Sequence, residues 1–466
     1  MKLTVLFLAV IFGMASHITA EAQKIIFTVE TTQVLREDAD KFIGVNLNYI
    51  RDEDKNRPLA RPLDAALKEM GVKWLRYPGG EKSDFYLWSQ PPYTRPHPVS
   101  LGYYGTVKGE RMDVDAFVAH ARAVGAEPYC VVGYDNVTRT QRTRKQWIES
   151  AVAWVRYANI TKKYRIRYWE IGNENWHNQT STPQEMAEIV AEFSTAMRTV
   201  DLSIKIGASG SAGGNWWANF LPKAAPHLDF LTLSLYNTWE WKGYDFLLAH
   251  PDTELIADAK TALNAIDQFA PLEDRARLRV IVAETNSMDY SPNGWKADNT
   301  LGHCLVTFDT LGKLMLQPRI LSAMVWTTRW MEDKEAAQTI WYSLDANNGI
   351  LPTGRAIGLW GQFMQRQRIA VSGSTSLVSA YAARSSNGKK MTVWVLNRGK
   401  EKAGDLEIKI NAGVRYQRAA VSVFTGNDAN DANPTLKQTG TLPLDGNQLK
   451  GLTCPGLSVT VLTFEK

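Results

Sequence analysis

Short apolar runs alternate with amphipathic stretches along most of this chain, and this alternation restricts its fold more than any other feature. Eight such runs lie at residues 42–47, 73–77, 127–132, 167–171, 204–208, 230–235, 279–283 and 320–326. Helical patterns lie between them at 62–70, 114–124, 145–160, 183–200, 256–269 and 301–315, and another follows at 354–366. Strands buried on both faces form continuous apolar runs, and parallel neighbours need crossover helices. The pattern predicts a (β/α)₈ barrel, with a doubly wound open sheet as the alternative.

The pattern changes after Arg368, where short alternating segments are separated by Gly, Asn and Pro. Segments at 377–383, 390–396, 405–410, 419–424 and 458–464 are typical of an antiparallel β-sandwich of about 100 residues. A strand at 25–30 precedes the first barrel strand, and we expect it to join this sandwich. The predicted domains are therefore 1–22 (signal peptide), 23–39 (N-terminal strand), 40–367 (barrel) and 368–466 (sandwich).

The first residues have the pattern of an export signal. Lys2 precedes an apolar run from Leu3 to Met14, and Ala20-Glu21-Ala22 has the small residues of a cleavage site. The run is too short to span a membrane, which takes about 20 residues. We expect cleavage before Gln23 and a secreted or periplasmic protein without a membrane-inserted segment.

Composition narrows the classes of partner. The net charge of +5 in 466 residues is too mild for a nucleic-acid-binding protein. The chain has 16 Trp and 17 Tyr, whose flat faces suit sugar rings, although buried Trp is also ordinary core filler. Cys130, Cys304 and Cys454 are far apart, and the seven His have no metal-ligand spacing. We expect free thiols, no metal and no cofactor, and the oligomeric state stays open.

Two glutamates follow barrel strands at positions that suit catalysis. Glu174 lies in YWEIGNENW after the fourth strand, and Glu284 lies in VIVAETN at the end of the seventh. Active sites of such barrels are built at the carboxyl ends of the strands. Two carboxyl groups on one rim can approach the roughly 5–5.5 Å that retaining glycosidases need. Glu170 lies within the strand and is expected in a structural network below the site.

Three segments carry a family resemblance: GNEN after strand four, AETN after strand seven, and LRYPGGEKSDFYLW (75–88) at strand two. Together with the barrel, they resemble the clan of retaining glycoside hydrolases whose two catalytic Glu follow strands four and seven. The segment at strand two resembles α-L-arabinofuranosidases, heparanase-like glucuronidases and some β-agarases. The C-terminal sandwich also suits those families.

The resemblance implies a role for each matching residue. Glu174 would be the acid/base and Glu284 the nucleophile. Asn173 would bind the hydroxyl beside the anomeric carbon, and Arg76 and Tyr236 would contact the nucleophile, although many relatives carry His at the latter position. Trp326 would form a platform for the sugar ring. From their positions after strand ends, Trp176, Trp239, Trp241, Trp330 and Tyr134 could also line subsites, with packing as the alternative.

The leading hypothesis is an exported retaining glycosidase acting on a plant or algal oligo- or polysaccharide, arabinofuranosidase- or glucuronidase-like. An endo-acting hydrolase similar to agarases or porphyranases is one alternative. A non-catalytic carbohydrate-binding protein on a barrel is another, but a retired enzyme usually loses one carboxylate and this chain keeps both. Arg76, Lys82 and Arg329 lie near strand ends and would suit a uronic or sulfated sugar, unless carboxylates such as Asp84 or Asp333 pair with them.

Overall fold

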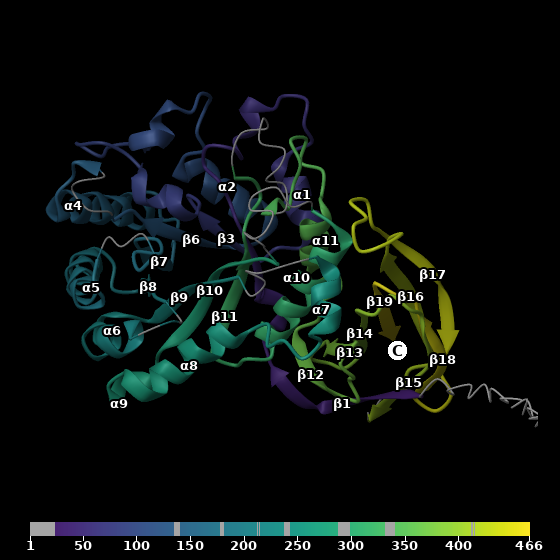
Figure 1. Cartoon of the computed structure of the whole chain (residues 1–466). Helices are drawn as coiled ribbons and strands as arrows, with labels where there is room; N and C mark the ends of the chain where they lie inside the picture. The colour runs from purple at the N-terminus through teal and green to yellow at the C-terminus, as the bar shows by residue number, and fades with distance from the viewer. Residues whose placement is uncertain are drawn as a thin grey trace, which may run out of the picture.

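A computed structural model describes residues 24–134, 140–177, 181–211, 213, 215–236, 243–287, 299–330, 341–411, 413 and 415–466. The predicted signal peptide lies outside the described residues. Figure 1 shows two bodies side by side, a helix-covered barrel and a sheet domain that contains the carboxyl terminus. No helix within the described ranges is long and apolar enough to cross a bilayer.

The barrel consists of eight parallel strands that close in the order β10-β11-β2-β3-β6-β7-β8-β9. Their bounds are β2 Ile43–Asn46, β3 Trp74–Tyr77, β6 Glu127–Val132, β7 Tyr168–Ile171, β8 Lys205–Ser209, β9 Phe230–Leu235, β10 Arg279–Thr285 and β11 Ile320–Val325. Each strand matches one apolar run. Because the strand order closes on itself, the barrel prediction is confirmed and the open sheet is wrong.

The helices that surround the barrel begin and end close to the amphipathic stretches. They are α1 Leu63–Met70, α2 Val114–Val124, α4 Arg144–Val155, α5 Pro183–Arg198, α6 Trp216–Ala224, α8 Ala257–Phe269, α10 Leu301–Met315 and α11 Pro352–Gly361. Thr182 and Glu185 form a capping box that fixes the start of α5. The sequence pattern missed α6, which contains Pro222 and follows a Gly-rich segment. The short helices α7 Tyr244–Ala249 and α9 Leu272–Arg275 were also not predicted.

The second body is a nine-stranded sheet in the order β17-β16-β19-β14-β13-β12-β1-β15-β18. Its strands are β1 Ile25–Arg36, β12 Gln367–Ser372, β13 Val378–Arg384, β14 Lys390–Asn397, β15 Ala403–Asn411, β16 Arg418–Thr425, β17 Thr435–Pro443, β18 Gln448–Cys454 and β19 Ser458–Glu465. All pairs are antiparallel except β1 with β15. Leu449 near one edge and Leu462 near the other share one apolar core, so the sheet folds over into two layers.

The first strand of the chain lies in this C-terminal sheet. β1 pairs with β12 on one side and with β15 on the other, and Figure 1 shows it in purple among the green and yellow strands. In both views, α10 and α11 lie between the barrel strands and the sheet domain. There Trp360 stacks on Phe308 at 4.3 Å and contacts Trp394 of β14 at 4.8 Å between ring centroids. The two bodies therefore share a packed apolar interface.

Candidate active site

Arg76 donates hydrogen bonds to side chains from several barrel strands and the turns that follow them. It lies near the carboxyl end of β3 and is 1% exposed, with carboxylates on two sides of its guanidinium. Its Nη1 donates to Glu284 Oε1 at 2.9 Å, and its Nε donates to Glu170 Oε2 at 3.0 Å. Its Nη2 donates to Asn173 Oδ1 at 2.7 Å. One buried guanidinium therefore connects β3, β7 and β10.

Glu284 is 4% exposed on β10 and receives two donors. Its Oε1 accepts from Arg76, and its Oε2 accepts from the Tyr236 hydroxyl at 2.7 Å. Burial and the charge of nearby Glu174 raise the pKa of Glu284 above its usual value, while Arg76 and Tyr236 oppose that rise. The two donors stabilise the ionised form of Glu284, and each of them binds one of its two carboxylate oxygens.

Glu174 lies on the turn after β7 in a backbone conformation that is unusual for a residue with a side chain. Its φ is 45°, in the left-handed region, and φ of Gly172 is 67°. A Cβ at Gly172 would lie 2.0 Å from Asn175 Oδ1, so this position requires glycine. Burial raises the pKa of Glu174, against a hydrogen bond from Ser234 and the charge of Arg76. Strained residues of this kind concentrate at functional sites.

Several residues of this network were not singled out from the sequence. Asn46, the last residue of β2, accepts from Arg76 Nη1 at 2.9 Å and donates to the Ala283 carbonyl at 2.8 Å. Tyr129 and Thr232 were also not singled out. Their hydroxyls donate at 2.6 Å and 2.5 Å to Glu170, which lies in a buried network as expected. A polar residue that ends an apolar strand was the available signal for Asn46.

Two indoles pack together after β11, the barrel neighbour of the strand β10 that carries Glu284. Trp326 follows β11 and lies 5.0 Å from Trp330 between ring centroids. A Cβ at Gly80 would lie 2.1 Å from Trp326 Cη2, so the glycine backbone packs directly on the indole. Lys82 Nζ lies 2.9 Å from the centroid of Trp330 and donates to the Trp330 carbonyl at 3.1 Å. Trp326 is therefore held between the strand-two turn and a second indole.

The remaining aromatic candidates are distributed differently. Trp176 is half-buried beside His177, at 5.3 Å between ring centroids. Tyr134 is buried and packs edge-on against Phe193, which favours packing. Trp239 and Trp241 lie outside the described residues. Within the ranges described, no group of three or more His, Cys, Asp or Glu is arranged to hold a metal ion.

Sequence comparison identifies relatives of the central part of the chain. Residues 66–242 match the family described as "Alpha-L-arabinofuranosidase 1 domain". Alpha-L-arabinofuranosidase C of Emericella nidulans is 27% identical over 205 residues, which cover 37% of this chain and 39% of that protein. An intracellular exo-alpha-(1->5)-L-arabinofuranosidase of Bifidobacterium longum is 28% identical over 231 residues, 45% and 40% of the two chains. The chain therefore matches about two fifths of the length of these relatives.

Structural comparison extends the likeness to nearly the whole chain. Alpha-L-arabinofuranosidase from Thermotoga maritima superimposes with a TM-score of 0.75 at 19% identity, covering 95% of this chain and 100% of that one. A Paenibacillus polymyxa xyloglucanase of glycoside hydrolase family 44 superimposes with a TM-score of 0.67 at 12% identity, covering 96% and 100%. At these identities the likeness concerns the fold. Together the comparisons confirm the predicted resemblance to the arabinofuranosidase-containing clan and agree with the predicted glycosidase class.

Proposed function

We propose that this chain is a retaining glycosidase that releases α-L-arabinofuranosyl units from an arabinose-containing oligo- or polysaccharide. The observation that carries the proposal is the pair of Glu174 and Glu284 at one barrel mouth, with Arg76 and Tyr236 both donating to Glu284. The match of residues 66–242 to an arabinofuranosidase domain supports the choice of sugar. That match includes Glu174 but ends before Glu284.

The proposed reaction is a double displacement. Glu284 attacks the anomeric carbon and forms a covalent glycosyl ester, while Glu174 gives its proton to the departing glycosidic oxygen. Water then enters, Glu174 takes a proton from it, and the resulting hydroxide cleaves the ester to release the sugar with its configuration retained. Asn173, fixed by Arg76 at 2.7 Å, is suited to hold the sugar hydroxyl next to the reacting carbon. Trp326 is suited to pack against the sugar ring.

The test uses an aryl α-L-arabinofuranoside followed by proton NMR of the first product. We expect hydrolysis and early appearance of the retained anomer. Early appearance of the inverted anomer would exclude the double displacement. Hydrolysis of aryl glucuronides or of agar, with arabinofuranosides untouched, would overturn the choice of sugar in favour of the glucuronidase- or agarase-like alternatives.

We propose further that the chain is exported, on the basis of the Lys2 to Ala22 sequence alone. Expression in a bacterial host should give a mature protein that begins at Gln23 in the secreted or periplasmic fraction, as N-terminal sequencing would establish. A protein that retains Met1 and stays in the cytoplasmic fraction would contradict this proposal.

A further inference from the structure

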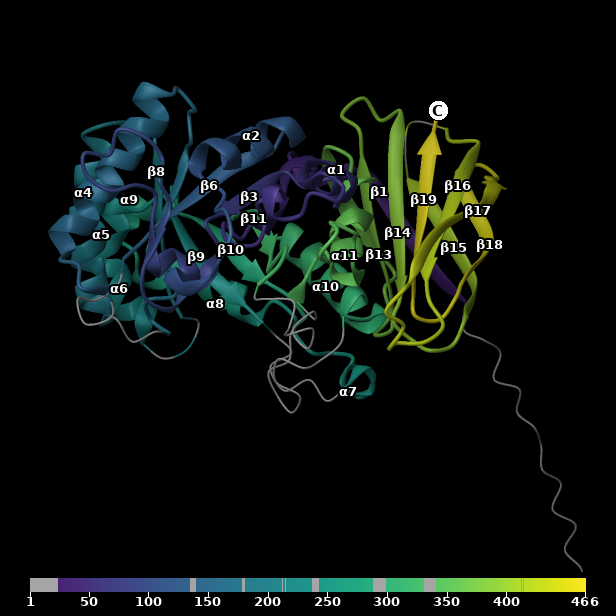
Figure 2. The ribbon, with the colours of Figure 1, turned by 90° about the horizontal axis from the view of Figure 1, so that it is seen from above.

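A cavity of about 310 Å³ lies where α10 of the barrel body meets β12 and β13 of the sheet domain. Both views show α10 on the side of the barrel that faces the sheet domain (Figures 1 and 2). The volume is at the lower end of the roughly 300–1,000 Å³ typical of small-molecule sites, so the cavity suits a small ligand. The charged residues of its described lining are Asp309 and Lys313 on α10, Arg368 on β12, and Arg398 after β14.

Arg368 is buried in this lining, and little of its hydrogen-bonding capacity is used. It is 1% exposed, and its Nη1 donates to the Ala382 carbonyl at 2.6 Å, whereas its Nε is buried without a hydrogen-bond partner. Its guanidinium lies over the rings of Tyr381 and Trp360, at 5.1 and 5.7 Å from their centroids. These rings favour a cation but do not replace hydrogen-bond acceptors for its N–H groups. Burial and the charge of Arg36 lower the pKa of Arg368 to about 10, against the effect of Tyr381, so it remains a cation at neutral pH.

The carboxylate in the described lining is occupied by other groups. Asp309 Oδ2 lies 3.4 Å from Lys313 Nζ and 3.6 Å from Arg398 Nη1. Its Oδ1 accepts from the Tyr381 hydroxyl. Arg368 makes no ion pair with any Asp or Glu of the described residues. Its charge is therefore not balanced by a carboxylate of that part of the chain.

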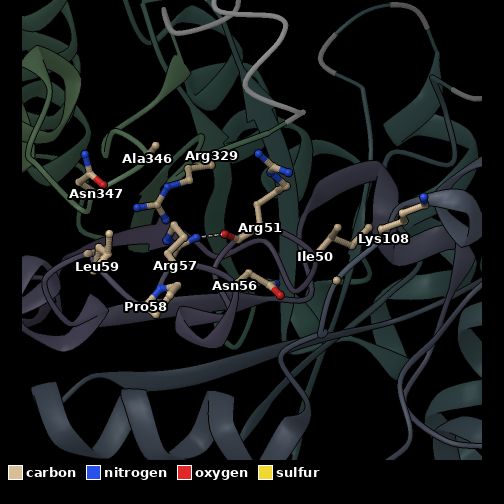
Figure 3. A pocket seen from close by; sticks show the side chains of 12 residues that line it. Ile50, Arg51, Asn56, Arg57, Pro58, Leu59, Lys108, Arg329, Ala346 and Asn347 are labelled. Atoms are coloured by element: carbon tan, nitrogen blue, oxygen red, sulfur yellow. Dashed lines mark hydrogen bonds between the residues drawn. The ribbon is translucent and has the colours of Figure 1, made fainter.

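Two other buried arginines of the molecule do face carboxylates. Arg76 pairs with two glutamates, and Arg329, which lines the cavity drawn in Figure 3, pairs with Asp52. A buried charge without a partner is strongly unfavourable, and a buried donor without an acceptor usually indicates a missing ion or water. The different situation of Arg368 therefore indicates that a counter-ion from solution enters this cavity.

Two further groups of the lining are buried without a hydrogen-bond partner. They are the Ser379 hydroxyl on β13 and the Nε of Arg398. Arg398 is fixed by its other nitrogens, since Nη2 donates to the Pro251 carbonyl at 3.2 Å and Nη1 lies near Asp309. Guanidinium N–H groups only donate, and a hydroxyl can donate. These groups therefore match a ligand with several charged acceptor oxygens.

We propose that this cavity binds a small oxyanion, which carries a carboxylate, sulfate or phosphate group. Arg368 supplies the balancing charge, and Ser379 and Arg398 are further donors. Because α10 belongs to the barrel and β12 and β13 belong to the sheet domain, the bound oxyanion connects the two bodies and stabilises their interface. This inference does not depend on the proposed function, and its test needs no substrate.

The test is thermal unfolding of the whole chain in millimolar citrate, sulfate or phosphate, compared with chloride at the same ionic strength. A ligand that binds the folded state alone raises the unfolding midpoint with the logarithm of its concentration. We expect a rise of about 2 °C for each tenfold increase above the Kd, and the anion with the largest rise identifies the preferred group. Equal midpoints in all three oxyanions and in chloride would overturn the proposal.

Arg368→Met tests whether the effect arises in this cavity, because it removes the guanidinium and keeps an unbranched side chain. It should abolish the rise that the oxyanion causes, whereas Arg418→Met, which replaces an exposed arginine on β16, should retain it. Without oxyanion, Arg368→Met should unfold at or above the wild-type temperature, because an unbalanced buried charge is gone. If Arg368 served only to stack on Trp360, the variant would keep the full oxyanion effect, and that result would overturn the proposal.

Ser379→Ala provides a second test that leaves the buried arginine in place. It removes one hydroxyl from the cavity and should weaken oxyanion binding roughly tenfold in calorimetry, with the midpoint without oxyanion unchanged. This variant decides the matter if Arg368→Met does not fold. Oxyanion binding as tight as that of the wild type would then overturn the proposal.

Discussion

Replacing Tyr236 by Phe removes one hydrogen-bond donor from Glu284 and keeps the aromatic ring. The Tyr236 hydroxyl lies 2.7 Å from Glu284 Oε2 and stabilises the ionised carboxylate. A hydrogen bond to a charged group contributes about 1.5–3 kcal/mol. Since one pKa unit corresponds to about 1.36 kcal/mol, ionisation of Glu284 should become harder by about one to two units.

Which limb of the pH profile of activity moves depends on which carboxyl group holds the last proton. Glu174 and Glu284 interact, so their protons leave in two steps that belong to the pair. If Glu284 ionises first and Glu174 keeps its proton, Tyr236→Phe makes only the first step harder. The acid limb of the pH profile of kcat/KM should then move up by about one to two units, with the alkaline limb unchanged.

The assay is kcat/KM for an aryl α-L-arabinofuranoside across the pH range. Tyr157→Phe is the matched control, because the Tyr157 hydroxyl donates to Asp115 at 2.9 Å on the outer helices. It should leave both limbs in place. Movement of the alkaline limb alone in Tyr236→Phe would mean that Glu284 holds the proton, which would refute the assigned roles. A uniform loss of activity with neither limb moved would refute the electrostatic role of Tyr236.

Three further outcomes are expected. Glu174→Ala should lower kcat about 10²–10⁴-fold on natural glycosides but less on aryl glycosides, and added azide should give a glycosyl azide of retained configuration. Glu284→Gly should lose activity on both substrates, and azide should give the glycosyl azide of inverted configuration. Proton NMR distinguishes the two products, and the opposite assignment of products would exchange the roles of the two residues. Removing the C-terminal sheet should expose the Trp360 face and give insoluble protein, so a soluble, active truncation would contradict the packed interface. Gly80→Ala would put a methyl group on the Trp326 ring and should lower stability by about 1–3 kcal/mol in thermal unfolding, whereas Gly404→Ala, which has open space, should have little effect.

The barrel could be predicted because each of its strands is buried on both faces. Such strands are nearly continuous apolar runs, and the eight observed strands begin and end within about two residues of the predicted ones. β17 was missed because most of its residues are exposed and polar, as in TLKQTGT, so no run of buried residues marks it. β12 was missed because the helical pattern at 354–366 leads directly into it.

Site residues could be predicted from the sequence only where they lie next to the end of a strand. Glu174 and Glu284 lie within short motifs. Arg51 and Lys108, in contrast, lie on loops about 57 residues apart in sequence and line one cavity (Figure 3). No local pattern reports that two such loops meet. The same holds for Lys82, whose contact with Trp330 joins the loops after β3 and β11.

The charges around Arg76 decide where the transferable proton resides. One guanidinium faces Glu170 and Glu284, and Glu174 adds a third carboxyl group to the same buried mouth. At the roughly 5–5.5 Å separation typical of retaining glycosidases, two carboxylates repel by about 3 kcal/mol at an effective dielectric constant of about 20, or about two pKa units. This repulsion, added to the effect of burial, favours a state in which one of the pair keeps its proton at pH values where an exposed glutamate is ionised. Because Arg76 and Tyr236 both donate to Glu284, we expect the ionised form to be favoured there and the retained proton to stay on Glu174, ready for the leaving oxygen.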